Sequence, residues 1–338
     1  MAITRITTNM VMRNYQNNLT STLGGLESSR KQVETGRRFV QSYEDPTSSA
    51  RAAILERRYS RTEEYLENVA NIQKWQDSQE DVVMKLSEIA RQIEKEYSVQ
   101  AVSDTSGETG RTAFAQALEE LQRSMVASLN AKYGDTYIMA GNEGKEPPFK
   151  LENGKLLYRG LDVDDPGNQA KLDKLAKEHS YVDLGFGLTF GANKEIVSSS
   201  AFDSAMPGIN VVGYGQTDKG LSKNLITLTG QMAELLRAEE NGGTFDSAKY
   251  KELWEQFSEG SEDLRDQMAT IGTKSQLLQS TEDRLENEKL AITQQFDKAV
   301  NIEPAEAIMN YSWAQYAYNT ALKVGTSIIT PSLLDFMK

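Results

Sequence analysis

Hydrophobic and small residues recur at alternating steps of three and four along most of this chain, which is the spacing of one face of an α-helix. The stripe near the N-terminus consists of Met12, Tyr15, Leu19, Thr22, Leu26, Ser29 and Val33. The stripe near the C-terminus consists of Ala307, Tyr311, Ala314, Tyr318, Ala321, Gly325 and Ile328. The pattern therefore predicts one helix at each end of the chain.

Two longer stripes lie between these ends, over residues 65–97 and 250–299, and each predicts a long helix. Asp45, with Pro46 directly after it, is placed to cap the first of these helices, because a carboxylate accepts hydrogen bonds from free N–H groups and proline suits the first turn. Asp246 is placed to open the second long helix in the same way.

Shorter stripes predict two further helices. One covers about 111–132, and the other begins after Asp218, which is a suitable N-cap, and carries Leu221 and Leu225 on its stripe. The last helix is expected to stop at Pro331, because proline cannot donate a backbone hydrogen bond.

The pattern of hydrophobic and polar residues changes between residues 134 and 217. Short apolar runs such as "VDLGFGLTFGANKEIV" are separated there by glycine, proline and asparagine. This pattern is typical of short strands joined by turns, with "AKLDKLAKEHS" as a candidate short helix. The segment is therefore predicted to be a compact β-rich insert.

The order of predicted elements is nearly the same from either end, and the simplest way to bury such long stripes is to pair the two halves. We therefore predict a mainly α fold, an elongated multi-helix bundle or coiled-coil rod built from both chain halves, with a smaller β-rich inserted domain in the middle. The predicted domains are an assembly domain (1–45 with 301–338), a helical rod (46–133 with 218–300) and an outer insert (134–217).

Both chain ends are poor in charge, although the 338-residue chain is 25% charged with a net charge of −12. Arg13 is the only charged residue between Ile6 and Leu26, and Lys323 is the only one between Ile308 and Ile329. A helix in water usually carries charges on its outer face, whereas uncharged polar and small residues all round suit a helix buried against copies of itself. The alternative is an ordinary two-helix core within one chain, which would explain one face of each helix only.

The two terminal helices have too little apolar surface to offset the entropy of ordering by themselves, so they are expected to be unfolded in the monomer. The candidate assembly interface combines members of both stripes with apolar residues of the tail. It consists of Met12, Tyr15, Leu19, Leu26, Val33, Tyr311, Ala314, Tyr318, Ala321, Ile328, Leu333, Leu334 and Phe336.

The composition argues against several classes of partner and of catalytic or metal site. The net negative charge argues against a nucleic-acid or anionic-membrane partner, and the absence of cysteine removes thiolate chemistry. His179 is the only histidine, which leaves no His-based metal site and no Ser–His or Cys–His pair, so it is expected at the surface or in a turn. Neither "GYGQTDKG", which lacks a Gly-Lys-Ser/Thr ending, nor "DVDDPGN", which lacks an EF-hand pattern, indicates a site. We expect no enzyme activity, cofactor or metal.

Several motifs in order resemble the bacterial flagellin family, most closely its hook–filament junction members. They are the opening "RITTNMVMRNYQNNL", the segment "ETGRRFVQSYEDPTSSARAAILERR", the run "YIMAGNEGKEPPF" and the terminus "SLLDFMK". The resemblance covers the helical frame at both ends of the chain. It implies a structural, self-assembling component that acts as a mechanical adaptor in the bacterial flagellum.

The same resemblance implies a set of partners and a route. The partners are further copies of the chain, a hook-associated protein on the hook side, flagellin on the filament side, and a cytoplasmic chaperone that binds the C-terminal helix. The route is type III export without a cleaved signal peptide. A filament flagellin is the first alternative, although "SLLDFMK" differs from the usual flagellin ending. An intracellular helical scaffold, or a hydrolase with its site in the insert, is the alternative from another class.

Overall fold

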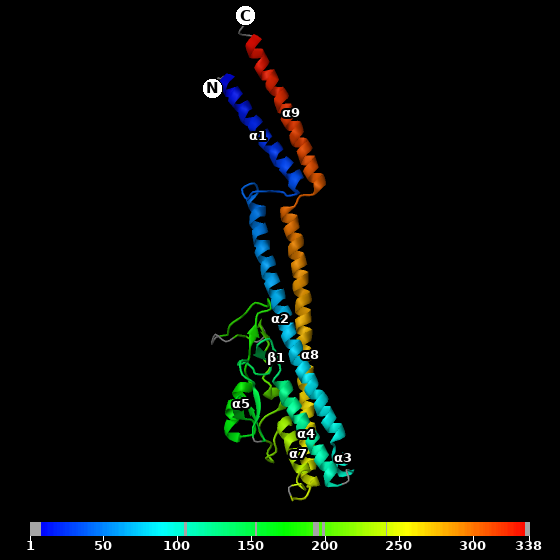
Figure 1. Ribbon diagram of the computed structural model, residues 1–338. Helices are drawn as coiled ribbons and strands as arrows, with labels where there is room; N and C mark the ends of the chain where they lie inside the picture. The colour runs from blue at the N-terminus through cyan, green and yellow to red at the C-terminus, as the bar shows by residue number, and fades with distance from the viewer. Residues whose placement is uncertain are drawn as a thin grey trace. The chain divides into compact units, whose positions relative to one another are not determined.

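The computed structural model describes residues 8–104, 107–152, 154–191, 196–197, 200–240 and 242–334. The chain forms two compact units, one made of Met1–Glu63 with Glu286–Lys338 and the other of Glu64–Leu285. Figure 1 shows that long helices dominate the chain and that the strands lie near its middle.

The described helices are α1 (Thr8–Thr35), α2 (Pro46–Glu96), α3 (Val99–Asp104), α4 (Glu108–Leu129), α5 (Gln169–Ala176), α6 (Ile209–Val212), α7 (Leu225–Leu236), α8 (Ser247–Val300) and α9 (Pro304–Leu334). The described strands are β1 (Lys132–Tyr133), β2 (Thr136–Tyr137), β3 (Phe149–Glu152), β4 (Lys155–Tyr158), β5 (Leu161–Asp162), β6 (Tyr181–Val182) and β7 (Phe202–Asp203). A short 3-10 turn, η1 (Pro166–Asn168), precedes α5.

Both long helices begin where their capping residues predict. The Asp45 carboxylate accepts a hydrogen bond of 3.0 Å from the backbone N–H of Ser48, and Pro46 is the first residue of α2. Hydrogen bonds from the Ser48 side chain and backbone also lower the pKa of Asp45. The Asp246 carboxylate accepts hydrogen bonds of 3.0 Å from the N–H groups of Ala248 and Lys249 at the start of α8.

Two predicted helix boundaries were wrong. Asp218 caps no helix, because it lies in a tight turn in which the N–H of Thr217 donates to the carbonyl of Leu221 at 2.8 Å. Helix α7 starts only after Asn224, whose side chain accepts hydrogen bonds from the N–H groups of the second and third helical residues. At the C-terminus, α9 continues past Pro331 to Leu334, so Pro331 does not stop the helix.

The β-rich insert shares one hydrophobic core with the helices of its unit. Strands β3, β4 and β5 form an antiparallel sheet in which Phe149 pairs with Tyr158. The two rings lie 4.9 Å apart, and both are buried in the same cluster as Leu118 of α4 and Leu228 of α7. Tyr250 of α8 is also fully buried there. The insert is therefore packed onto the helices and not held by a linker alone.

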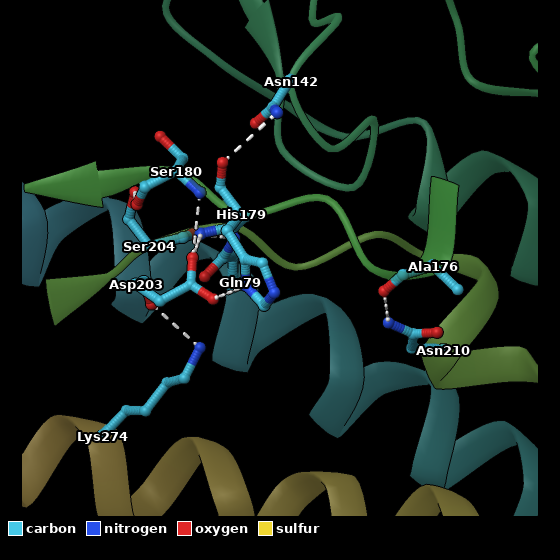
Figure 2. A network of polar contacts seen from close by, with 10 residues as sticks. Gln79, Asn142, Ala176, His179, Ser180, Asp203, Ser204, Asn210 and Lys274 are labelled. Atoms are coloured by element: carbon cyan, nitrogen blue, oxygen red, sulfur yellow. Dashed lines mark hydrogen bonds and ion pairs between the residues drawn. The ribbon is translucent and has the colours of Figure 1, made fainter. Parts of the chain in front are cut away.

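Polar contacts also anchor the insert on two helices (Figure 2). The Lys274 ammonium of α8 donates to the backbone carbonyl of Asp203 at 2.9 Å, and the Gln79 amide of α2 donates to the carbonyl of Ser204 at 3.3 Å. On the insert side, the Nδ1 atom of His179 lies 2.7 Å from the Asp203 carboxylate. His179 is exposed, as predicted, and its role here is to hold two insert segments together.

These observations confirm a mainly helical fold in which long helices pack on one another, with a smaller β-containing region in the middle of the sequence. The short helix predicted in the insert is α5. Of the helices described, none combines the length and the apolar character that crossing a bilayer requires.

Candidate assembly interface at the terminal helices

Helices α1 and α9 pack side by side within their unit, as Figure 1 shows for the dark blue and red helices. Their partly or fully shielded residues follow the predicted heptad stripes. These residues include Met12, Tyr15, Leu19, Thr22, Leu26 and Ser29 of α1 and Ala307, Tyr311, Ala314, Tyr318, Ala321 and Gly325 of α9. The predicted stripes are thus the faces that the two helices turn toward each other.

Close packing between the two helices depends on a small residue at position 325. The Tyr15 phenol lies directly against Gly325, and a Cβ atom added to this glycine would overlap the phenol oxygen. Ala314 and Ala321, which are seven residues apart, alternate with the larger Tyr311 and Tyr318 on the same face. Small residues between large ones let the helix backbones approach each other.

The connections that lead into the two terminal helices are bonded to each other. The N–H of Arg38 donates to the carbonyl of Val300 at 2.7 Å, and the N–H of Ile302 donates to the carbonyl of Gly36 at 3.0 Å. Gly36 has a φ of +68°, in the left-handed region that favours glycine. This short ladder fixes the end of α1 beside the start of α9.

The outer face of α9 exposes large apolar side chains. Trp313 is 67% exposed and Tyr316 is 65% exposed, and Ile308 and Met309 are more than half exposed. The Trp313 and Tyr316 rings meet edge to face with their centroids 6.3 Å apart. Together with Met309 and Ser312 they line an open groove of about 540 Å³.

The exposed face of α9 also lacks charge. No residue from Ala307 to Leu322 is an Asp, Glu, Lys or Arg. Exposed aromatic and methionine side chains without neighbouring charges are typical of surfaces that become buried against another protein. Such a surface can supply binding energy without desolvating an ion. The geometry therefore favours a binding role for this face.

The structure places the predicted interface residues on different surfaces. Met12, Tyr15, Leu19, Leu26, Tyr311, Ala314, Tyr318 and Ala321 line the shielded faces between α1 and α9. Val33 is 42% exposed. The side chains of Ile328, Leu333 and Leu334, and the whole of Phe336, lie outside the described residues. A role for these residues in contacts between copies stays a prediction.

The candidate interface predicted from the sequence did not include the exposed apolar residues Ile308, Met309, Trp313 and Tyr316, because they lie off the heptad stripe. A signal for them was present, since large apolar residues beside a stripe in a helix without charges indicate a second buried face. Within the described residues, no group of three or more His, Cys, Asp and Glu side chains could hold a metal ion.

Residues 6–143 match the family described as the bacterial flagellin N-terminal helical region. Over 341 aligned residues the chain is 21% identical to flagellar hook-associated protein 3 of Escherichia coli (strain K12), covering 99% of this chain and 100% of that protein. The resemblance to the flagellins predicted from the sequence is thereby confirmed.

Two solved structures support the same fold. A putative flagellar hook-associated protein from Vibrio parahaemolyticus has a TM-score of 0.58 at 16% identity, with 76% of this chain and 100% of that chain covered. Flagellar hook-associated protein 3 from Legionella pneumophila has a TM-score of 0.50 at 11% identity, with 73% of this chain and 98% of that chain covered.

Proposed function

We propose that this chain, whose residues 6–143 match the N-terminal helical region of the bacterial flagellins, joins the hook to the filament of the bacterial flagellum. It acts there as a structural, self-assembling protein and not as an enzyme. The observation that carries this proposal is the pairing of the flagellin-type α1 with α9, which leaves an uncharged aromatic face exposed. Alignment with hook-associated protein 3 over the full length of both chains favours the junction among the flagellar roles.

The proposed mechanism is mechanical adaptation between a flexible hook and a stiff filament. Copies of the chain pack their terminal helices (1–45 and 301–338) into an inner tube, so that neighbours cover Trp313, Tyr316 and the residues around them. The helical segments 46–133 and 218–300 contact neighbouring copies, and the insert (134–217) faces outward.

The terminal helices gain their order from this assembly, because burial of the outer apolar face adds the stabilisation that one helix pair lacks. Before assembly, the exposed apolar face of the C-terminal helix has to be shielded by another protein in the cytoplasm. We therefore include a cytoplasmic export chaperone that binds this helix, followed by type III export without a cleaved signal peptide. A hook-associated protein on the hook side and flagellin on the filament side complete the set of partners.

A filament flagellin is the second candidate, since the matched N-terminal region is shared by flagellins in general. The C-terminal sequence "SLLDFMK" favours the junction role. Electron microscopy of the purified protein separates the two candidates. A junction protein stays monomeric or forms short oligomers without its hook-side neighbour, whereas a flagellin forms long filaments.

Deletion of the gene tests the proposed function in the cell. We expect deletion to leave hooks that carry no filament, with flagellin released into the medium, and expression of the full-length chain to restore filaments. Cells without this chain that still bear normal filaments would overturn the proposal. Loss of the hooks themselves would also overturn it, because it would place the chain at an earlier stage.

A further inference from the structure

One exposed face of α2 concentrates positive charge on a chain whose net charge is −12. Arg51, Arg58 and Arg61 share this face, because steps of seven and three bring residues to the same side of a helix. All three are exposed, and the exposed side chain of Ile54 lies between them at helical spacing. We call these four residues the arginine face. Among the residues that the structure describes, none of the three guanidinium groups forms an ion pair.

An exposed face of α8 in the other unit has the opposite charge and the same spacing. Its members recur at steps of three, four, three and four, and all are exposed. They are Glu252, Glu255, Glu259, Glu262 and Asp266. We call them the acidic face. The salt bridge described for this face is the 3.7 Å contact between Lys251 and Glu255.

The two faces carry opposite charges, and their charged residues have the same spacing along the helix. Arg51 and Arg58 are seven residues apart, as are Glu252 and Glu259, and seven residues of α-helix span about 10.5 Å. Two helices laid along each other could therefore place each arginine opposite a carboxylate. Ile54, at the centre of the arginine face, would then lie between two ion pairs and be shielded from water.

We infer that the arginine face of one copy docks on the acidic face of the next copy. The inference rests on the proposed function and deepens it by naming one contact between copies. Because the two faces differ, the contact is heterologous and can repeat from copy to copy in a ring or a helical array. The complementary charges would fix the register of the contact more than its strength, since exposed ion pairs contribute little individually.

Charge reversal tests the contact in cells that lack their own copy of the gene. Arg51→Glu with Arg58→Glu, or Glu252→Arg with Glu259→Arg, should each lower the number of filament-bearing hooks roughly tenfold, because like charges then oppose each other. All four changes combined should restore at least half of the wild-type number. The matched control is Lys171→Glu with Lys174→Glu, which reverses two exposed charges on α5 and should leave the number unchanged.

The outcomes separate this inference from the proposed function. If the wild-type chain restores no filaments, the proposed function fails. If the wild-type chain and both reversed variants restore filaments equally, or if the fourfold variant stays as defective as its parents, the contact between the two faces is wrong. Equal melting temperatures of the purified variants exclude misfolding as the cause of a defect.

The absence of cysteine allows a second test that does not depend on charge reversal. Cells that express Arg58→Cys and Glu259→Cys chains together should yield a covalent dimer from isolated flagella treated with a short bifunctional thiol-reactive crosslinker, which spans the distance that the two ion-paired side chains span and a direct disulfide cannot. Arg58→Cys expressed with Lys171→Cys serves as the control and should yield none. A dimer in the control at equal yield, or no dimer in the test pair when both chains are present in the flagella, would overturn the inference.

Discussion

Tyr15 of α1 lies directly against Gly325 of α9, where a Cβ atom at position 325 would overlap the phenol oxygen of Tyr15. The contact joins residues that are more than three hundred positions apart in the sequence. It therefore couples the two ends of the chain, and it depends on the absence of a single Cβ atom.

Gly325→Ala should impair assembly without changing the stability of the monomer core. Overpacking of this kind costs about 1–3 kcal/mol, and the midpoint of about 2 kcal/mol corresponds to roughly a thirtyfold loss of assembly. Filament-bearing hooks and the melting temperature of the monomer provide the two measurements. Tyr15→Ala combined with Gly325→Ala should recover part of the loss, because the smaller side chain makes room, and no recovery at all would contradict the contact.

Asn224→Ala should destabilise the second unit by about 2–3 kcal/mol. The side chain is fully buried, accepts hydrogen bonds from the N–H groups of Ile226 and Thr227, and donates to the carbonyl of Gly213 at 2.6 Å. Its removal leaves these groups without a partner. Asp218→Ala is the matched control, since Asp218 is exposed and caps no helix, and its effect in urea unfolding should stay within about 0.5 kcal/mol. Equal effects of the two changes would contradict the assignment of the cap.

Gln76→Leu should stabilise the second unit by about 1–2 kcal/mol. Gln76 is 1% exposed, and neither its amide nitrogen nor its amide oxygen has a hydrogen-bond partner in the described residues. Gln73→Leu is the control, because Gln73 donates to the Glu282 carboxylate at 2.9 Å and gains nothing from the change. A loss of stability in Gln76→Leu during urea unfolding would show that the buried amide is satisfied after all.

Stability of the second unit should rise with pH in the alkaline range because of Lys274. Burial lowers the pKa of its ammonium from the usual 10.5, although Asp203 opposes the shift. Between the folded and unfolded pKa values the unfolded chain binds more protons, so the free energy of unfolding increases as the pH rises through this window.

Replacement of Lys274 tests that pH dependence directly. Lys274→Met should remove the rise from urea-unfolding measurements taken at increasing pH up to about 10.5. Lys249→Met, at an exposed position of the same helix, should keep the rise. The same slope in Lys274→Met as in the wild type would contradict the assignment to Lys274.

The sequence was most informative where one helix face packs against another. Tyr15 and Tyr318 belong to long heptad stripes, and both lie on shielded faces. The pairing of Phe149 with Tyr158 could not be predicted, because strands of two to four residues carry too little periodicity to fix a register.

Other details depended on tertiary context. Asp218 and Asn224 both suit an N-cap, and only the backbone turn between them selects Asn224. Trp313 lies within the helix predicted near the C-terminus, but its exposure depends on which face α1 covers. Local pattern therefore predicted the elements and their shielded stripes, while the remaining surfaces followed from how those elements pack.

Limited proteolysis of the purified monomer, with mass spectrometry of the fragments, tests most directly whether the terminal helices require neighbouring copies. We predict that protease removes about the first 40 and the last 35 residues and leaves a stable core, and that the same ends resist cleavage in assembled flagella. A monomer whose two ends resist protease as well as the core does would contradict the proposal that assembly orders them.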